Sequence, residues 1–302
     1  MQFFLFLQRF FLPAMLIIYF LDVRANDSLN QILQNDSDKY RLKLLFEYLF
    51  KSHEPFAYTL FGDKPMSFSF VIKPEPSAES TLNFMRIDEY ALILLKKNHL
   101  PGVFYAQAWD VWDKNYSFKF KNFLFVKRKL GNSLAIFLIN KEAFHKTVNT
   151  HINLFKNLLG KDINSEKILN EIEQENSDIW EILHQRDCLL GILLGFGRHN
   201  SILFEKRENL EKKLNRLNFI QSYQEMQTVK NQIDRLWDIL KLRNDYYTSG
   251  LAIGNSIAFV ADRDHPESKI LEAKYKEQEV KISEIYSRND WFEQTLLRLI
   301  FY

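Results

Sequence analysis

Residues 118–140 read FKFKNFLFVKRKLGNSLAIFLIN, and this stretch decides the predicted fold. Two apolar runs, 118–127 and 133–139, flank a short polar segment that contains Gly131 and Asn132. A Gly-Asn pair between two apolar runs is typical of a tight β-hairpin turn. The stretch therefore predicts two antiparallel strands joined by a short turn.

A third strand is predicted upstream of this hairpin, over residues 66–73. Large apolar residues alternate there with smaller ones, which is the pattern of a strand with one face half buried. Pro74 and Pro76 end the strand, and the turn-forming residues Gly62, Asp63 and Pro65 precede it. Together with the hairpin, this strand predicts a small antiparallel sheet of at least three strands.

Most of the remaining chain is predicted to be helical. Gly and Pro number only 9 and 7 in 302 residues, so long helices with few breaks are expected. Apolar residues recur at helical spacing over 36–52, 80–98, 103–114, 141–158, 165–175, 178–204, 205–218, 222–243, 267–288 and 290–301, and Gly160 is predicted to cap the fourth of these helices. The predicted class is α+β and predominantly helical, with a small antiparallel sheet packed against a helical bundle. We expect one domain over 26–302, with a mixed half at 26–160 and a helical half at 161–302.

The amino-acid composition excludes several classes of protein. Hydrophobic residues make up 46% and charged residues 26%, which excludes a disordered or collagenous chain. The net charge of +2 gives no field that would attract nucleic acid, so no nucleic-acid partner is expected. The single Cys188 excludes an internal disulfide and a cysteine-based metal cluster, and we expect it to be buried. No metal or cofactor motif is found in the sequence.

The first 25 residues are typical of a secretory signal peptide. Residues 1–9 end in Arg9, residues 10–21 are an unbroken apolar run, and Val23-Arg24-Ala25 supplies a cleavage site. The alternative is a retained anchor, but a spanning helix of about 20 residues would have to bury Gln8 and Arg9. We expect cleavage after Ala25 and a periplasmic or secreted protein. No later segment reaches 18 apolar residues, so no transmembrane segment is expected in the mature chain.

The first candidate site follows a glycine-rich break. Gly191, Gly195 and Gly197 lie within seven residues of an otherwise helical stretch, where each glycine costs about 1 kcal/mol relative to alanine. One interpretation is close helix packing at a kink, and the other is a polar binding site at Arg198, His199 and Asn200. The break is not a phosphate loop, because a Walker sequence needs Lys-Ser/Thr and a Rossmann turn needs a preceding strand.

The second candidate site is the turn at Asp63 and Lys64. Asp63 could act as a base and Lys64 could bind an anion, although an aspartate in a turn most often only shapes the turn. If a site exists, we expect this turn to meet Arg198, His199 and Asn200, with Asp63 paired to Arg198. The alternative places them apart, with Asp63 capping its own turn and Arg198 in water.

Other catalytic patterns are weak. Cys188 lies four residues after His184, but it sits deep in an apolar helix where a thiolate is disfavoured. His145 and His151 are six residues apart, which places them on opposite faces of a helix and gives no two-histidine metal site. No serine lies in a G-x-S-x-G nucleophile elbow.

Three internal segments carry a resemblance. The segments TLFGDKP (59–65), FLINK (137–141) and GILLGFGR (191–198), with the apolar N-terminus, resemble an uncharacterised family of exported proteins from intracellular bacteria of protist hosts. The resemblance implies only that these segments belong together, since the family brings no known activity, fold or ligand.

Two function classes stay open. One is a non-enzymatic binding or interaction protein, directed at a host or envelope partner or at a small molecule. The other is a hydrolase-like enzyme of unrecognised type, with a site near Asp63 and Arg198-His199-Asn200. Convergence of polar groups from distant segments on one concave pocket would distinguish an enzyme from a binding protein.

The predicted cleavage of the signal peptide can be tested directly. N-terminal sequencing of the protein from its native cell should give Asn26 as the first residue, because the apolar run is short enough to be cleaved rather than retained. Protein that begins at Met1 and is extracted only with detergent would contradict cleavage.

Overall fold

The computed structural model describes residues 36–52, 55–71, 108–114, 120–130, 133–174, 177–220, 223–242 and 260–301. The chain divides into two compact units, one formed by Met1–Phe46 with Pro76–Phe118 and the other by Glu47–Glu75 with Lys119–Tyr302. The predicted signal peptide and the predicted helix at 80–98 lie outside the described residues. The predicted single domain over 26–302, with its halves meeting at residue 160, stays a prediction.

The described part of the first unit is helical. It consists of α2 (Asp36–Phe46) and a helical segment at 108–114. The rings of Phe46 and Trp112 lie 5.4 Å apart, so the two segments pack together through aromatic side chains. The helix predicted over 36–52 changes at Phe46, and the π-helix η1 (Glu47–Ser52) that follows belongs to the second unit.

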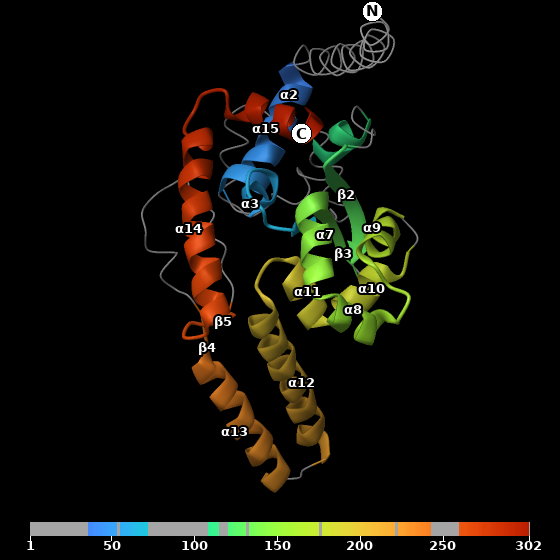
Figure 1. Cartoon of the computed structure of the whole chain (residues 1–302), viewed down its shortest axis with the longest axis vertical. Coiled ribbons are helices and arrows are strands. Elements are labelled where there is room, and N and C mark those ends of the chain that lie inside the picture. Colours follow the sequence, from blue (N-terminus) through green and yellow to red (C-terminus); the bar gives the residue numbers. More distant parts are fainter. Residues whose placement is uncertain are drawn as a thin grey trace, which may run out of the picture. The chain divides into compact units, whose positions relative to one another are not determined.

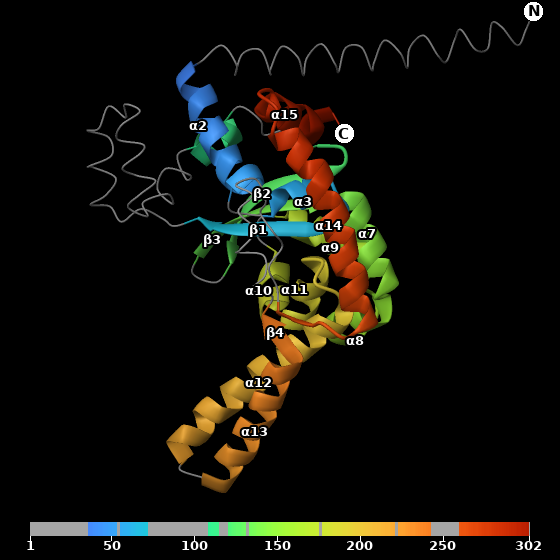
Figure 2. The same ribbon diagram turned by 90° about the vertical axis from the view of Figure 1, so that its left-hand side faces the viewer.

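The second unit contains the predicted sheet (Figures 1 and 2). Its strands are β1 (Met66–Val71), β2 (Phe123–Leu130) and β3 (Ser133–Asn140), in the order β1-β3-β2 and antiparallel throughout. Leu130 pairs with Ser133, so only two residues connect the strands of the hairpin. The prediction of a three-stranded antiparallel sheet is confirmed, although β2 begins at Phe123 rather than at residue 118.

The central strand is buried on both faces. Phe137 stacks on Trp180 at 3.9 Å and on Phe68 at 5.6 Å, within the main hydrophobic cluster. On the other face, the ring of Phe125 lies 6.1 Å from Phe50 and 6.4 Å from Phe56. On β1, Phe68 is partly buried, as the pattern predicted, whereas Ser67 and Ser69 on the opposite face are buried.

The serine face of β1 is buried because its polar groups find partners. Ser67 donates a hydrogen bond to the carbonyl of Pro55 at 3.0 Å and lies 2.8 Å from the hydroxyl of Thr59. A buried hydroxyl that is hydrogen bonded carries little of the usual desolvation cost. Ser67 is therefore fully buried next to α3 (Phe56–Leu60) although its side chain is polar.

Five short helices cover the other face of the sheet. They are α7 (Lys141–Thr150), α8 (Ile152–Leu159), α9 (Ser165–Glu173), α10 (Ile179–His184) and α11 (Asp187–Leu193). Asn140 at the end of β3 accepts a hydrogen bond from the backbone N–H of Ala143 and so starts α7 directly after the strand. Gly160 ends α8, as predicted.

Two long helices, α12 (Arg198–Ile220) and α13 (Tyr223–Ile239), lie side by side and extend away from the sheet (Figures 1 and 2). Leu217, Val229 and Ile233 form their small apolar core. The helix predicted over 178–204 is wrong, because the structure has α10, α11 and the start of α12 there. The predicted break between residues 204 and 205 is absent, since α12 runs through it.

The end of this helix pair leads into a two-stranded ribbon that the sequence did not predict. Its strands are β4 (Leu240–Leu242) and β5 (Val260–Asp262). Helix α14 (Pro266–Tyr286) then packs on α3 through a perpendicular contact between the rings of Tyr275 and Tyr58, and α15 (Trp291–Phe301) follows. Among the helices described, none has the length and the apolar character that crossing a membrane requires.

The central strand makes a stability prediction. Phe137→Ala should lower the free energy of unfolding by about 3–5 kcal/mol, because it removes a fully buried ring between two aromatic neighbours. Urea unfolding followed by tryptophan fluorescence measures the loss. Val280→Ala, at a side chain 61% exposed, is the control and should change stability by less than about 0.5 kcal/mol.

Candidate functional site

The chain turns sharply between α11 and α12. Gly195 and Gly197 have φ values of +77° and +84°, a conformation that favours glycine. A Cβ atom on Gly197 would lie 2.7 Å from Leu271 and 2.9 Å from Glu267, both on α14. The two glycines therefore allow the turn and also let the start of α12 approach α14 closely.

Glu267 joins the starts of α12 and α14. Its carboxylate accepts hydrogen bonds from the backbone N–H of Arg198 at 2.9 Å and of His199 at 2.8 Å. The first N–H groups of a helix have no partner within that helix, and a negative charge there is favourable. One carboxylate therefore satisfies the first turn of α12 from a second helix.

Two stacked imidazoles lie next to this contact. The rings of His199 and His265 are 3.6 Å apart and nearly parallel. His199 Nε2 donates to the carboxylate of Asp262 at 3.0 Å, whereas His265 Nδ1 accepts from the backbone N–H of Glu267 at 3.3 Å. His265 is the N-cap residue of α14, and its side chain caps the first turn of that helix.

Asp262 is held in its charged form. Its partial burial would raise the pKa of the carboxyl group, but the hydrogen bond from His199 and the backbone N–H of Asp264 outweigh burial and lower this pKa. Asp262 therefore orients His199 as an anionic acceptor. The same aspartate is the last residue of β5, so the unpredicted ribbon supplies one partner of the site.

Asn200 links α12, β5 and α14 through the hydrogen bonds of its buried side chain. It is 1% exposed; its side-chain oxygen accepts from the backbone N–H of Asp262 and the hydroxyl of Ser268, and its amide donates to the carbonyl of Phe196. With all three contacts made inside the protein, Asn200 positions α12, β5 and α14 relative to one another. It does not face a ligand.

A third imidazole belongs to His151, which lies between α7 and α8. Burial is the largest influence on its pKa and lowers it; Glu267 opposes this decrease and Arg198 adds to it. Within the part of the chain that the structure describes, its ring has no hydrogen-bond partner. The same holds for the guanidinium of Arg198.

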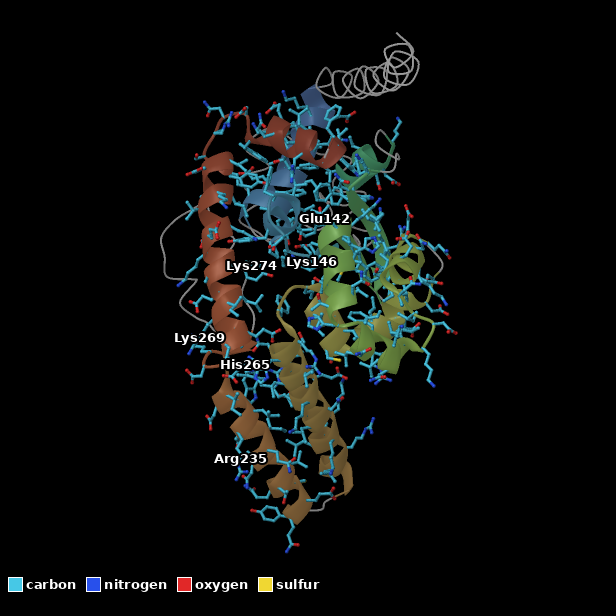
Figure 3. All side chains as sticks on the ribbon, viewed as in Figure 1. Glu142, Lys146, Arg235, His265, Lys269 and Lys274 are labelled. Atoms are coloured by element: carbon cyan, nitrogen blue, oxygen red, sulfur yellow. The ribbon has the colours of Figure 1, made fainter. Side chains whose placement is uncertain are left out.

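These groups surround a cavity of about 550 Å³. The junction of α7 and α8 contributes Thr150, His151, Asn153 and Leu154. The helix starts contribute Arg198, His199 and Ile202 from α12, and His265 and Glu267 from the start of α14. Figure 3 shows His265 at the lower end of α14, beside the first turn of α12. The cavity is therefore formed where three helix ends converge.

The structure places the site residues predicted from the sequence at two separate locations. Arg198 and His199 line the cavity, and Asn200 lies behind it. Asp63 instead pairs with Lys274 at 2.9 Å and accepts from Gln278, both on α14. Burial would raise the pKa of Asp63, but the hydrogen bonds from Gln278 and Lys274 lower it.

The expected pair of Asp63 with Arg198 is replaced by these contacts to α14. Lys274 lies seven residues beyond Glu267, which is about 10 Å along the helix, and Figure 3 shows Lys274 well above His265. Lys64 is 1% exposed and donates to the carbonyl of Met66 and to Ser67, so it is not open to a ligand. The turn does approach the glycine break, since Lys64 Nζ lies 5.8 Å from the ring of Phe196.

Among the titratable residues of the site, four were not predicted from the sequence as functional: His151, Asp262, His265 and Glu267. A signal existed for the last two, because Asp264-His265-Pro266-Glu267 is typical of a helix start. His151 was considered only as a member of one continuous helix, whereas the structure interrupts the helix at this residue.

Cys188 takes no part in the cavity. It is buried, as predicted, and burial together with Glu205 raises the pKa of its thiol to about 12. Its backbone N–H donates to Glu205 at 2.8 Å. In the described segments, no group of three or more His, Cys, Asp or Glu side chains is arranged to hold a metal ion.

Comparisons with protein-family models, with curated proteins and with solved structures found no match to this chain. The resemblance carried by the segments at 59–65, 137–141 and 191–198 therefore stays a prediction.

The cavity makes a prediction about pH. Because burial lowers the pKa of His151 in the folded protein, the unfolded chain binds a proton first as pH falls below about 6.5. The free energy of unfolding should therefore decrease as pH falls from 7.5 to 5.5. His151→Gln should reduce this decrease, measured by urea unfolding at both pH values. An equal decrease in both proteins would show that His151 does not contribute.

Proposed function

We propose that this protein binds a small polar molecule in the cavity formed by the ends of α7, α12 and α14. A volume of about 550 Å³ lies within the range of small-molecule sites, which is about 300–1,000 Å³. Leu154 and Ile202 add apolar surface to an otherwise polar lining. This mixture suits a ligand with a polar group on an organic body.

One observation carries the proposal: polar groups without partners converge on the cavity from separate helices. The ring of His151 and the guanidinium of Arg198 both line it, and neither has a hydrogen-bond partner among the described residues. Other polar groups of the lining are engaged: His199 binds Asp262, and Glu267 binds two backbone N–H groups. Arg198 is exposed and His151 is half-buried, so a ligand in the cavity can reach both groups.

The predicted signal peptide gives this proposal its compartment. A protein cleaved after Ala25 would meet its ligand in the periplasm or outside the cell. A non-enzymatic exported binding protein, with a small molecule as its partner, is the function that combines the predicted compartment with the cavity.

A hydrolase is the second candidate, and one observation favours it. His199 is oriented by Asp262 at 3.0 Å, as a general base would be. Against it, the hydroxyls of Thr150 and Ser201 donate to the carbonyls of Lys146 and Gly197. In the described part of the site, no hydroxyl is hydrogen bonded to an imidazole, so no activated side-chain nucleophile is present.

The binding proposal predicts a selective effect of filling the cavity. Asn153→Trp places a large ring in the cavity at an exposed position, so it should abolish binding without loss of folding. Asn157→Trp is the matched control, because Asn157 is exposed on the same helix, α8, and does not line the cavity. Ligand-observed NMR with a mixture of anionic, cationic and neutral fragments measures binding.

Two results would contradict the proposal. One is that no fragment of any charge binds the wild-type protein. The other is that fragment binding survives Asn153→Trp as well as Asn157→Trp, because the fragments would then bind elsewhere. Turnover of an ester substrate that is lost in His199→Asn would favour the hydrolase instead.

A further inference from the structure

We infer that the ligand of this cavity carries a phosphate monoester group, held by Arg198 and His151. This inference rests on the proposed function, because it names the chemical class of the molecule that the cavity binds. It follows from the charges that face the cavity, from the donors that remain available there and from the apolar surface beside them.

The hydrogen-bond donors in the lining favour an anion. Arg198 is the lining residue with a permanent positive charge, and the carboxylate of the lining is that of Glu267. Both oxygens of Glu267 accept backbone N–H groups of α12, so this carboxylate is already engaged. Asp262 is engaged as well, by His199 and by the backbone N–H of Asp264. An anion in the cavity would therefore meet a guanidinium with no competing acceptor among the described residues.

The donors are those of side chains and not of a helix end. The first two N–H groups of α12 are already bound by Glu267, so the start of this helix offers no free anion site there. Arg198 presents a planar fork of N–H groups that matches phosphate oxygens. His151 and the exposed amide of Asn153 line the same cavity from the junction of α7 and α8, and the charge of Arg198 acts on the ring of His151. A tetrahedral group with three free oxygens can accept from more of these donors at once than a planar carboxylate, which has two oxygens.

The remaining cavity predicts an organic body on the phosphate. A volume of about 550 Å³ is much larger than one phosphate group needs. Leu154 from α8 and Ile202 from α12 line the space beside the charged groups. Burying an apolar part of the ligand against them would add affinity that free phosphate lacks.

Binding should be coupled to protonation of His151. The groups that face this ring are Arg198 and His199 from α12, and His265 and Glu267 from the start of α14. Burial disfavours the charged imidazole of His151 and Arg198 adds to this effect, whereas Glu267 opposes it. A bound phosphate dianion would offset burial and Arg198, so the complex should take up part of a proton at neutral pH.

Isothermal titration calorimetry at pH 7 tests the ligand class with four probes: phenyl phosphate, inorganic phosphate, benzoate and phenol. Phenyl phosphate should bind most tightly. Arg198→Gln should weaken its binding by about 10- to 100-fold, as expected for losing a charged hydrogen bond. Arg216→Gln, at an exposed position of the same helix away from the cavity, should leave the affinity unchanged. Repeating the titration in buffers of different ionisation enthalpy should show proton uptake that is lost in His151→Gln.

Each contrary result would overturn a different part of the inference. Phenol binding as tightly as phenyl phosphate would overturn the anion and leave the binding function intact. Tighter binding of benzoate, or of inorganic phosphate, would overturn the monoester. Equal losses in Arg198→Gln and Arg216→Gln would show a general effect of charge and overturn the assignment to Arg198. Proton uptake that persists in His151→Gln would overturn the role of His151. If no fragment of any charge binds, the proposed function itself fails.

Discussion

The contact between the Glu267 carboxylate and the first two N–H groups of α12 organises the functional end of the second unit. It satisfies backbone donors that a helix start leaves unpaired, and it does so from another helix, 68 and 69 residues away in sequence. Because Glu267 is in the first turn of α14, the same contact places His265 against His199. The cavity, the stacked rings of His199 and His265, and the contact of His199 with Asp262 therefore all lie at the starts of α12 and α14.

The sequence could predict those parts of the fold whose pattern of residues lies within one short stretch of the chain. The hairpin of β2 and β3 has two apolar runs and a two-residue turn, and all of them lie within one short stretch. The break at residues 185–186 was not predicted, because apolar spacing continues across it, whereas Gly195 and Gly197 did indicate the break at 194–197. Tertiary contacts decide those breaks, such as the hydrogen bond from Tyr275 to the carbonyl of Gly195. The ribbon of β4 and β5 was missed because three-residue strands give no periodic signal.

The residues of the candidate site also differ in whether the local sequence could predict them. Arg198 and His199 could be predicted because glycines mark the break before them, and unusual backbone often accompanies function. Asp63 could not be placed from sequence, since its partner was decided by which turn of α14 passes the loop. His151 and Asp262 carry no motif and join the site only through the fold. Sequence therefore identified one wall of the cavity, and long-range packing supplied the others.

Helix α12 is continuous from the cavity at Arg198 to the far end of the helix pair at Ile220. Its 23 residues span about 34 Å, and the core shared with α13 stiffens the pair. The glycine turn comes directly before Arg198, so a tilt of α12 at this point would be carried along the whole helix. A tilt of about 5° would displace the far end by about 3 Å.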